Sequence, residues 1–288
     1  MRSVLLILAL LAGIASLHAE AAGIRFALVR TSGTSTLEAL SVAGGSWIHR
    51  ARFNHTAVLI QHHAATLLFD TGLGSHARAQ FDQDMPWWGK PLFRFGEVKP
   101  VRAQLNGSGI RVDRILLSHA HWDHASGLSD FPDVPVWAPY EEIEYAQTGT
   151  PPAVFPSEFS RGTRWTPYEF SSGPFLGFDA SLDLFGDGSL VLVPMPGHSP
   201  GSVGLFVTLE DGRRFLFSGD TSWRLSAFDG PHEKFWISRK LVDQDRQRTL
   251  AALARVRLLM RAHPEISVIP AHDADAQDRL GYYPTWIQ

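Results

Sequence analysis

The six residues from His119 to His124 constrain this chain more than any other part of its sequence. They read His-Ala-His-Trp-Asp-His and directly follow the apolar run from Val112 to Ser118, which we expect to form a buried strand. Burying three imidazoles and a carboxylate costs free energy unless they have polar partners. A tight loop at a strand end can aim alternate members of this set at two adjacent cations. Mixed nitrogen and oxygen donors suit a borderline-soft ion such as zinc.

Three further polar residues each stand just past an apolar, strand-like run. They are His198 in a Pro-Gly-His-Ser-Pro-Gly turn, Asp220 in Ser-Gly-Asp-Thr, and His272 in Pro-Ala-His-Asp. Taken singly, each has an ordinary explanation, such as an exposed histidine or a turn-forming aspartate. Because the ends of parallel strands meet at one edge of a sheet, the four groups together indicate a single site.

The rest of the chain reads as short strands, one long helix and two irregular stretches. The segment from Ile24 to Asp70 is strand-like, and Asp211-Gly212 indicates a hairpin turn. We expect further strands at 190–193, 203–209, 214–218 and 266–270, a helix at 241–262, a surface loop at 81–100 and an irregular stretch at 149–173. Strands interspersed with a long helix predict one compact α/β unit.

Composition excludes several classes of protein. The 288 residues contain no cysteine, which excludes disulfides, thiolate metal sites and a cysteine nucleophile. Lys and Arg total 26 against 29 Asp and Glu, so no basic excess is available to neutralise a nucleic-acid backbone. We therefore expect no nucleic-acid partner. The expected partner is a small-molecule substrate, and the oligomeric state is left open.

The N-terminal segment has the pattern of a signal peptide. Arg2 precedes an apolar run from Val4 to Ala15, and Ala19-Glu20-Ala21 fits an A-x-A cleavage site. We predict a signal peptide at 1–21, with cleavage after Ala19 as an alternative, and one domain at 22–288. No later apolar run reaches the length of a membrane span, so we expect a periplasmic or secreted protein without stable membrane insertion.

The combined pattern HxHxDH, GH, GD and a late His resembles the metallo-β-lactamase fold superfamily. The resemblance implies an αββα sandwich over nearly the whole mature chain. It also implies two divalent metal ions, with zinc as the expected metal, and Asp70 as an acid that supports the site. By resemblance the ligands are His119, His121 and His198 for one metal, Asp123, His124 and His272 for the other, and Asp220 as the bridge.

Within that superfamily the chain is most similar in pattern to N-acyl-homoserine lactonases and the methyl parathion hydrolase group. This implies an exported hydrolase in which a metal-bridging hydroxide opens a lactone or ester and Asp123 shuttles a proton. Trp223 stands where those lactonases usually have a tyrosine. Hydrolysis of organophosphate triesters or of β-lactams therefore remains an alternative. A catalytically silent metal-binding periplasmic protein is the alternative of a different class.

Two groups of side chains allow more than one interpretation. A set of aromatic residues either lines an apolar mouth for the substrate or anchors a long loop: Trp87, Trp88, Phe93, Phe95, Trp122 and Trp223. Most of the histidines outside the motifs are expected at the surface or hydrogen-bonded in the core; the set is His49, His55, His62, His63, His76, His232 and His263. The adjacent pair His62-His63 is not expected to bind metal, because neighbouring strand residues point to opposite faces.

Overall fold

The computed structural model describes residues 23–288 except 64, 160–161 and 231. The predicted signal peptide at 1–21 lies outside the described residues. Among the helices that are described, none is long and apolar enough to span a membrane.

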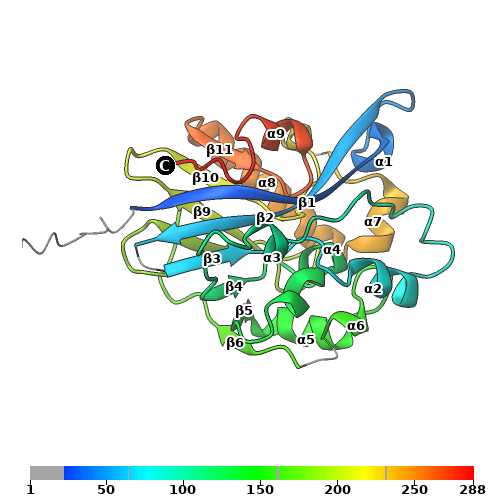
Figure 1. Cartoon of the computed structure of the whole chain (residues 1–288). Coiled ribbons are helices and arrows are strands. Elements are labelled where there is room, and N and C mark those ends of the chain that lie inside the picture. Colours follow the sequence, from blue (N-terminus) through cyan, green and yellow to red (C-terminus); the bar gives the residue numbers. More distant parts are fainter. Residues whose placement is uncertain (1–22, 64, 160–161, 231) are drawn as a thin grey trace, which may run out of the picture.

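Within the described residues the strands form two sheets, one of six strands and one of five (Figure 1). The first sheet follows chain order: β1 (Arg25–Leu37), β2 (Arg50–His62), β3 (Ala65–Phe69), β4 (Arg114–Leu116), β5 (Val136–Pro139) and β6 (Trp165–Tyr168). The second sheet has the order β11-β10-β9-β8-β7, with β7 (Leu182–Asp183), β8 (Leu190–Pro194), β9 (Val203–Thr208), β10 (Arg214–Phe217) and β11 (Ile266–Ile269).

Helices cover the outer faces of both sheets. They are α1 (Glu38–Ser41), α2 (Ala77–Asp84), α3 (Val101–Gln104), α4 (Trp122–Ala125), α5 (Tyr140–Thr148), α6 (Pro156–Phe159), α7 (Trp236–Val242), α8 (Arg246–Ala262) and α9 (Ala274–Asp278), with 3-10 turns at Ser126–Asp130 and Leu225–Phe228. The two sheets with their outer helices form the αββα sandwich that the family resemblance implies.

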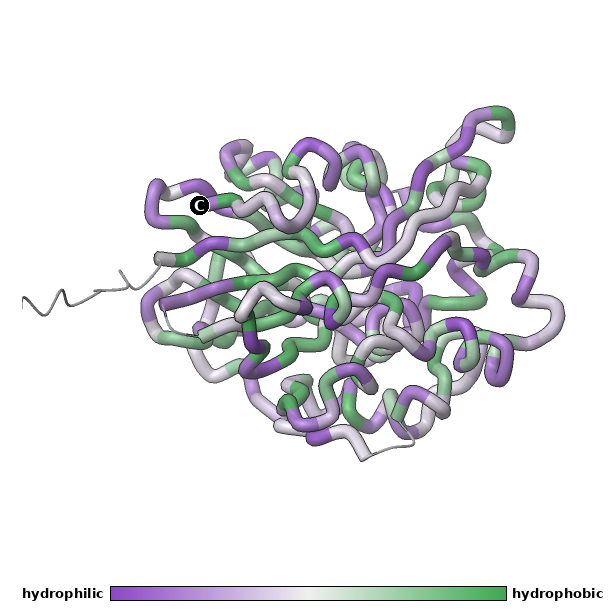
Figure 2. The backbone as a smooth tube through the Cα atoms, in the orientation of Figure 1, coloured by the Kyte–Doolittle hydropathy of each residue, from purple (hydrophilic) through white to green (hydrophobic). Residues whose placement is uncertain are grey.

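Alternation along the strands explains the layers. Val58 and Ile60 of β2 pack between the sheets against residues such as Leu205 of β9, whereas Leu59 faces the outer layer. Successive strand side chains point to opposite faces, so an unbroken apolar run serves two cores. The outer face of the second sheet packs on Leu253 and neighbouring residues of α8. Figure 2 shows the hydrophobic colour along the inner strands and the hydrophilic colour on outer loops.

The structure differs from the predicted elements in four places. The predicted loop at 81–100 includes the end of α2, and the strand at 112–118 is regular only over β4. The irregular stretch at 149–173 contains α6 and β6. The helix at 241–262 is two helices: α7 ends at Val242, and α8 begins after Asp245, whose side chain accepts a hydrogen bond from the Arg248 N–H. An N-cap of this kind starts a new helix although the apolar spacing continues across it.

The direction of the strands brings the polar motifs together. β3 and β4 run parallel, and so do β10 and β11, while β8 and β10 both run antiparallel to β9. The carboxyl ends of β3 and β4 in one sheet, and of β8, β10 and β11 in the other, therefore lead into the motifs that contain the predicted ligands.

Candidate metal centre

His119, His121 and His198 form one compact group, which we call the first half of the centre. Each offers a ring nitrogen, and these nitrogens lie within 4.8 Å of one another. The loop after β4 supplies the first two residues and the turn after β8 supplies His198. All three side chains are buried, and the Nε2 atoms of His119 and His198 are 3.1 Å apart. The motifs predicted a single site, and the family resemblance implied this grouping within it.

Partners outside the first half fix the orientation of its rings. His198 Nδ1 lies 2.7 Å from Asp243 Oδ1, and Lys234 Nζ donates to the same oxygen over 2.9 Å. His121 Nε2 lies 3.2 Å from the Tyr145 hydroxyl. These contacts leave one nitrogen of each ring directed into the group. Asp243, Lys234 and Tyr145 were not identified from the sequence, because each is a single polar residue in a helix, loop or helix end with no motif.

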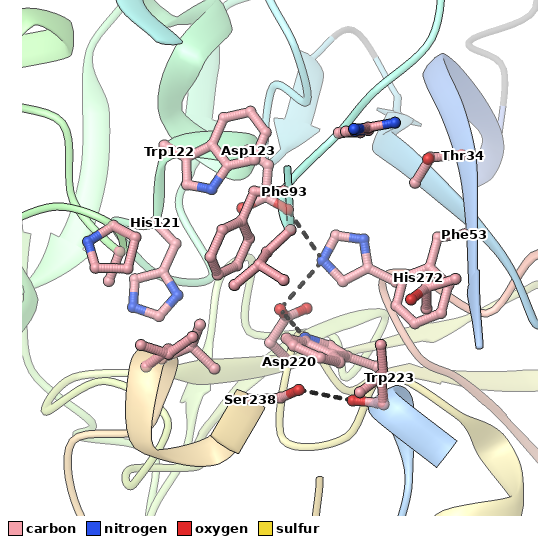
Figure 3. Close-up of a pocket in the computed structure, with 18 of the residues that line it drawn as sticks. Thr34, Phe53, Phe93, His121, Trp122, Asp123, Asp220, Trp223, Ser238 and His272 are labelled. Carbon is pink, nitrogen blue, oxygen red and sulfur yellow. Dashed lines mark hydrogen bonds and ion pairs between the residues drawn. The ribbon is translucent and has the colours of Figure 1, made fainter. Parts of the chain in front are cut away.

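Asp123, His124 and His272 form the second half, and Asp220 lies beside both halves. His124 Nε2 and His272 Nε2 are 3.3 Å apart, and Asp123 Oδ2 is 3.3 Å from His272 Nε2. Asp220 Oδ2 lies 3.1 Å from His272 Nε2 and 3.5 Å from His198 Nε2. The carboxylate thus reaches a histidine of each half. Figure 3 shows Asp123 and Asp220 joined to His272 by dashed lines.

The second half is supported from the first sheet. Asp70 follows β3 with φ of 63°, a left-handed conformation that aspartate tolerates better than most residues. Its carboxylate accepts hydrogen bonds from Ser118 N and Ser118 Oγ, both over 2.7 Å, and its Oδ2 is 2.8 Å from His124 Nδ1. The Asn54 carbonyl holds His272 Nδ1 at 2.7 Å. Asp70 therefore occupies the supporting position that the resemblance implied.

His55 is a residue of this site that the sequence did not reveal. It is buried on β2, and its Nε2 lies 3.7 Å from Asp123 Oδ2. Its ring also packs edge-on against His272, with centroids 5.5 Å apart. The expectation of a surface or ordinary core histidine is wrong here. His55 lies in the middle of a long strand, so no strand end or motif marks it.

Glu142 links the two loops that carry the first half. It is fully buried on α5, where its Oε1 accepts from Ala120 N over 2.6 Å. Its Oε2 accepts from Ser199 Oγ over 2.6 Å and from Gly201 N over 2.9 Å. Burial raises the pKa of Glu142 to about 7, against the opposing effect of these hydrogen bonds. One carboxylate thus ties the loop around His119 to the turn around His198.

The two halves differ in their electrostatics. Burial and the neighbouring imidazoles lower the pKa values of His119 and His121 well below the usual histidine value. Burial acts in the same direction on His124 and His272, but nearby carboxylates outweigh it and raise both pKa values. For Asp220, the facing histidines overcome the effect of burial and lower its pKa well below the ordinary range.

The arrangement of the donors fits a pair of divalent cations. Asp220 Oδ1 is buried and makes no hydrogen bond within the described part of the chain, although His124 Nε2 is 3.4 Å away. The inward-facing nitrogens approach one another in pairs, and their lone pairs repel unless a positive charge lies between them. Histidine nitrogens and carboxylate oxygens are the donors that zinc and related ions accept. The residues present therefore fit the metal ions that the resemblance implied.

An apolar pocket opens onto the donors. Phe53, Phe93 and Trp122 line it together with Trp223, whose Nε1 donates to Asp220 Oδ2 over 2.7 Å (Figure 3). Both interpretations of the aromatic residues are thus correct in part. Phe95 is buried away from this lining and packs on Trp122 with centroids 5.7 Å apart, as an anchor does.

The remaining two aromatics of that set play neither part. Trp87 is 84% exposed and Trp88 is 37% exposed, and neither lines the pocket. Nothing in the structure explains their exposure.

Comparison with known proteins agrees with this geometry. The sequence model of the family described as the metallo-beta-lactamase superfamily matches residues 50–272. A probable metallo-hydrolase of Mycobacterium tuberculosis strain H37Rv is 28% identical over 204 residues, which span 63% of this chain and 62% of that protein. The chain thus matches less than two thirds of that relative's length.

Lactonases are among the similar proteins. The N-acyl homoserine lactonase AttM of Azorhizobium caulinodans is 28% identical over 216 residues, 69% of this chain and 73% of that protein. The structure of a single-residue mutant of AiiA from B. thuringiensis, with N-decanoyl-L-homoserine bound at the active site, superposes with a TM-score of 0.68 at 18% identity. That superposition covers 91% of this chain and 98% of AiiA, which shows a shared fold.

Proposed function

This chain belongs to the metallo-beta-lactamase superfamily, and on that premise we propose that it is a metal-dependent hydrolase that opens a lactone or ester carrying an apolar chain. The observation that carries the proposal is the joint position of the donors and the pocket. Five imidazoles and two carboxylates meet at the base of a cavity whose walls are largely apolar. An apolar cavity with a few convergent polar groups is the usual form of a small-molecule site.

The chain's own residues would hold two cations in the arrangement described above. His119, His121 and His198 would hold one, Asp123, His124 and His272 the other, and Asp220 both. When bound, such ions lower the pKa of a water and polarise the oxygen of a substrate carbonyl. The donor set favours zinc among the common ions, since most of its members are imidazoles.

Asp123 is placed to handle the proton of the reaction. Its side chain is 14% exposed and lines the pocket, whereas Asp220 is more deeply buried. One of its oxygens faces His272 and His55. Burial lowers the pKa of His55 to about 4, so this ring is neutral at physiological pH. We propose that Asp123 passes a proton to the leaving oxygen.

The walls of the pocket favour an acyl chain as the group next to the reacting bond. Leu40 of α1, Phe93 of the loop after α2, and Ile237 and Leu241 of α7 line it. Burying one methylene contributes about 0.8 kcal/mol, or about a fourfold gain in kcat/KM. We therefore expect kcat/KM for N-acyl-homoserine lactones to rise with chain length by up to about that factor per methylene until the walls are covered.

Trp223 takes the place of a substrate-facing tyrosine with a different contact. Its indole N–H donates to Asp220 rather than lying free in the cavity. We propose that it holds the Asp220 carboxylate and contributes an apolar face to the pocket. Binding of the substrate carbonyl would then depend on the cations and not on a hydroxyl.

The first experiment is base consumption in a pH-stat with zinc-loaded protein and N-decanoyl-homoserine lactone, beside a chelated control. Chelator-sensitive acid release supports lactone opening. No release from protein shown to hold two zinc ions would overturn the lactone substrate. The Asp123→Asn variant should then separate proton handling from substrate binding, by lowering kcat more than it raises KM.

Organophosphate triesters are the second candidate. The four aromatic side chains at the pocket, Phe53, Phe93, Trp122 and Trp223, suit an aryl leaving group. An aryl phosphotriester and a β-lactam should be assayed under the same conditions. A kcat/KM for the phosphotriester above that for every lactone would replace the first proposal with this one.

We also propose that the protein is exported, with residues 1–21 removed as a signal peptide. The proposal is supported by the N-terminal pattern and by the absence of cysteine, which makes oxidative folding unnecessary. N-terminal sequencing of protein recovered from the periplasm or medium tests it. Recovery of uncleaved chain only from the cytoplasm would contradict it.

A further inference from the structure

A second group of metal-binding side chains lies at the far end of β2. His62 ends that strand and His63 begins the turn toward β3. His63 has φ of 49°, so the strand alternation stops there and the two imidazoles lie together, with centroids 4.3 Å apart. The expectation that they point to opposite faces is therefore wrong.

An aspartate from the other sheet completes the group. Asp187 lies in the connection between β7 and β8, and its Oδ2 is 2.8 Å from His62 Nε2. His62, His63 and Asp187 each offer one donor atom, and these atoms lie within 4.8 Å of one another. Glu210 lines the same surface pocket and offers a further carboxylate nearby.

Two of the three donors are held in place by the fold. His62 is buried and stacks on Phe185 with centroids 3.8 Å apart and an interplanar angle of 13°. Asp187 Oδ1 accepts hydrogen bonds from Ser189 N over 2.9 Å and from Ser189 Oγ over 2.5 Å. These bonds leave Oδ2 directed at His62. His63 and Asp187 are both exposed, and His63 closes the group from the solvent side.

This group is separate from the candidate metal centre. His55 contacts that centre, and His62 lies seven residues further along the same strand, about 23 Å away at the rise of a β-strand. Figure 1 places the β2–β3 connection at the end of the sheets away from α4. A cation at His62 therefore touches neither the substrate pocket nor its ligands.

We propose that His62, His63 and Asp187 form an additional site for a divalent transition-metal ion, zinc or one of similar softness, that joins the two sheets. Two imidazoles and a carboxylate are a donor set that such ions accept, with water or Glu210 filling the remaining positions. The ion takes the place of the His62–Asp187 hydrogen bond. It links the β2–β3 turn of the first sheet to the β7–β8 connection of the second, and it stabilises the folded protein without entering the reaction.

Zinc stoichiometry tests the site. The purified protein, without a polyhistidine tag, is titrated with zinc against a chromophoric chelator. His63→Ala should hold one equivalent fewer than wild type, and His49→Ala, which removes an exposed histidine elsewhere, should match wild type. Equal stoichiometry in all three proteins would overturn the proposal. Because the criterion is a difference between variants, it does not depend on how many ions the candidate metal centre holds.

Thermal unfolding supplies the second readout. Excess zinc should raise the Tm of wild type and of His49→Ala by more than it raises the Tm of His63→Ala or Asp187→Asn. The same increase in all four proteins would show that this end of the molecule binds no ion that matters for stability. Hydrolysis by His63→Ala should stay at the wild-type rate, so a failure of the proposed function and a failure of this site are distinguishable.

Discussion

The two halves of the candidate metal centre use the same residue types in different surroundings. His119, His121 and His198 are supported by Asp243, which follows α7, and by Tyr145 and Glu142 of α5. His124 and His272 are supported by Asp70 and the Asn54 carbonyl, from β3 and β2 of the first sheet. The pKa values of the first-half histidines are lowered, and those of His124 and His272 are raised.

The difference teaches that one binding site is prepared by two routes. The first half keeps its imidazoles neutral through burial, and its loops are held together by the single carboxylate of Glu142. In the second half, carboxylates surround the imidazoles of His124 and His272 and attract either a proton or a cation to them. The two supports come mainly from separate elements, so each half should be open to selective perturbation. Asp220 and Ser118 are exceptions: Asp220 reaches both halves, and Ser118 Oγ lies 2.7 Å from Asp70 Oδ2 and 2.9 Å from His119 Nδ1.

Replacing Asp220 should have the largest effect. Asp220→Ala removes the carboxylate that faces both halves, and the loss of several kcal/mol of transition-state stabilisation lowers kcat/KM by about 1000-fold or more. Lactone or ester hydrolysis at saturating zinc measures it. Asp229→Ala, at an exposed position nine residues later, is the control and should leave the rate unchanged. A loss below tenfold would mean that the halves work without a shared ligand.

Replacing Asp70 should weaken the second half most, because Asp70 contacts His124 directly and reaches His119 only through Ser118. Asp70→Asn keeps the side-chain shape and tolerates the left-handed backbone but loses the charge beside His124, which should lower zinc affinity there by about 10- to 100-fold. Two double variants are compared. In the first combination Asp70→Asn is joined with His121→Ala, which disables the first half, and in the second it is joined with His272→Ala, which disables the second half. Chelator competition should show the larger loss in the first combination. The same loss in both would contradict independent support.

Replacing Asp243 should give the reverse pattern. Asp243→Asn removes the charge next to His198 and deprives buried Lys234 of its partner at 2.9 Å. When Asp243→Asn is combined with His272→Ala, zinc affinity should fall by about 10-fold or more. When Asp243→Asn is combined with His121→Ala, it should leave zinc affinity unaffected. Retention of affinity with His272→Ala would show that Tyr145 and Glu142 suffice to hold the first half.

The smallest effect concerns Glu142 and pH. A glutamate pKa of about 7 in the folded state exceeds the usual 4.5, so its stabilising contribution is complete below pH 4.5 and is lost as pH rises through 7. The unfolding free energy of metal-free wild type should therefore decline with pH relative to Glu142→Gln, by at most about 1.4 kcal/mol per pH unit. Urea unfolding at pH 5 and pH 8 measures the difference.

Glu144→Gln, an exposed change on the same helix, is the control for that experiment and should follow wild type. A wild-type curve parallel to that of Glu142→Gln would place the Glu142 pKa near its ordinary value. The carboxylate would then be ionised throughout that range and would tie the two loops as a charged group.

The sequence indicated much of the site because the ligands belong to short local motifs. His119 to His124 lie in one loop, and His198, Asp220 and His272 each follow an apolar strand closely. The strand positions were predicted well, since a short apolar run of β-branched and aromatic residues is compatible with few structures other than a strand. The helix limits were less accurate: one capping aspartate, Asp245, divides a stretch whose apolar spacing continues.

Only the tertiary structure determines the contacts between single residues that lie far apart in the chain. His55 lies in mid-strand, Asp243 and Lys234 flank α7, and Glu142 lies on α5, and none carries a local signal. The sequence predicts that His62 and His63, as neighbouring strand residues, point to opposite faces. The positive φ of His63 at the turn instead places both imidazoles beside Asp187. A sequence records which donor types follow which strands, because that relation is local. The partners that orient the donors depend on how two sheets and their helices pack.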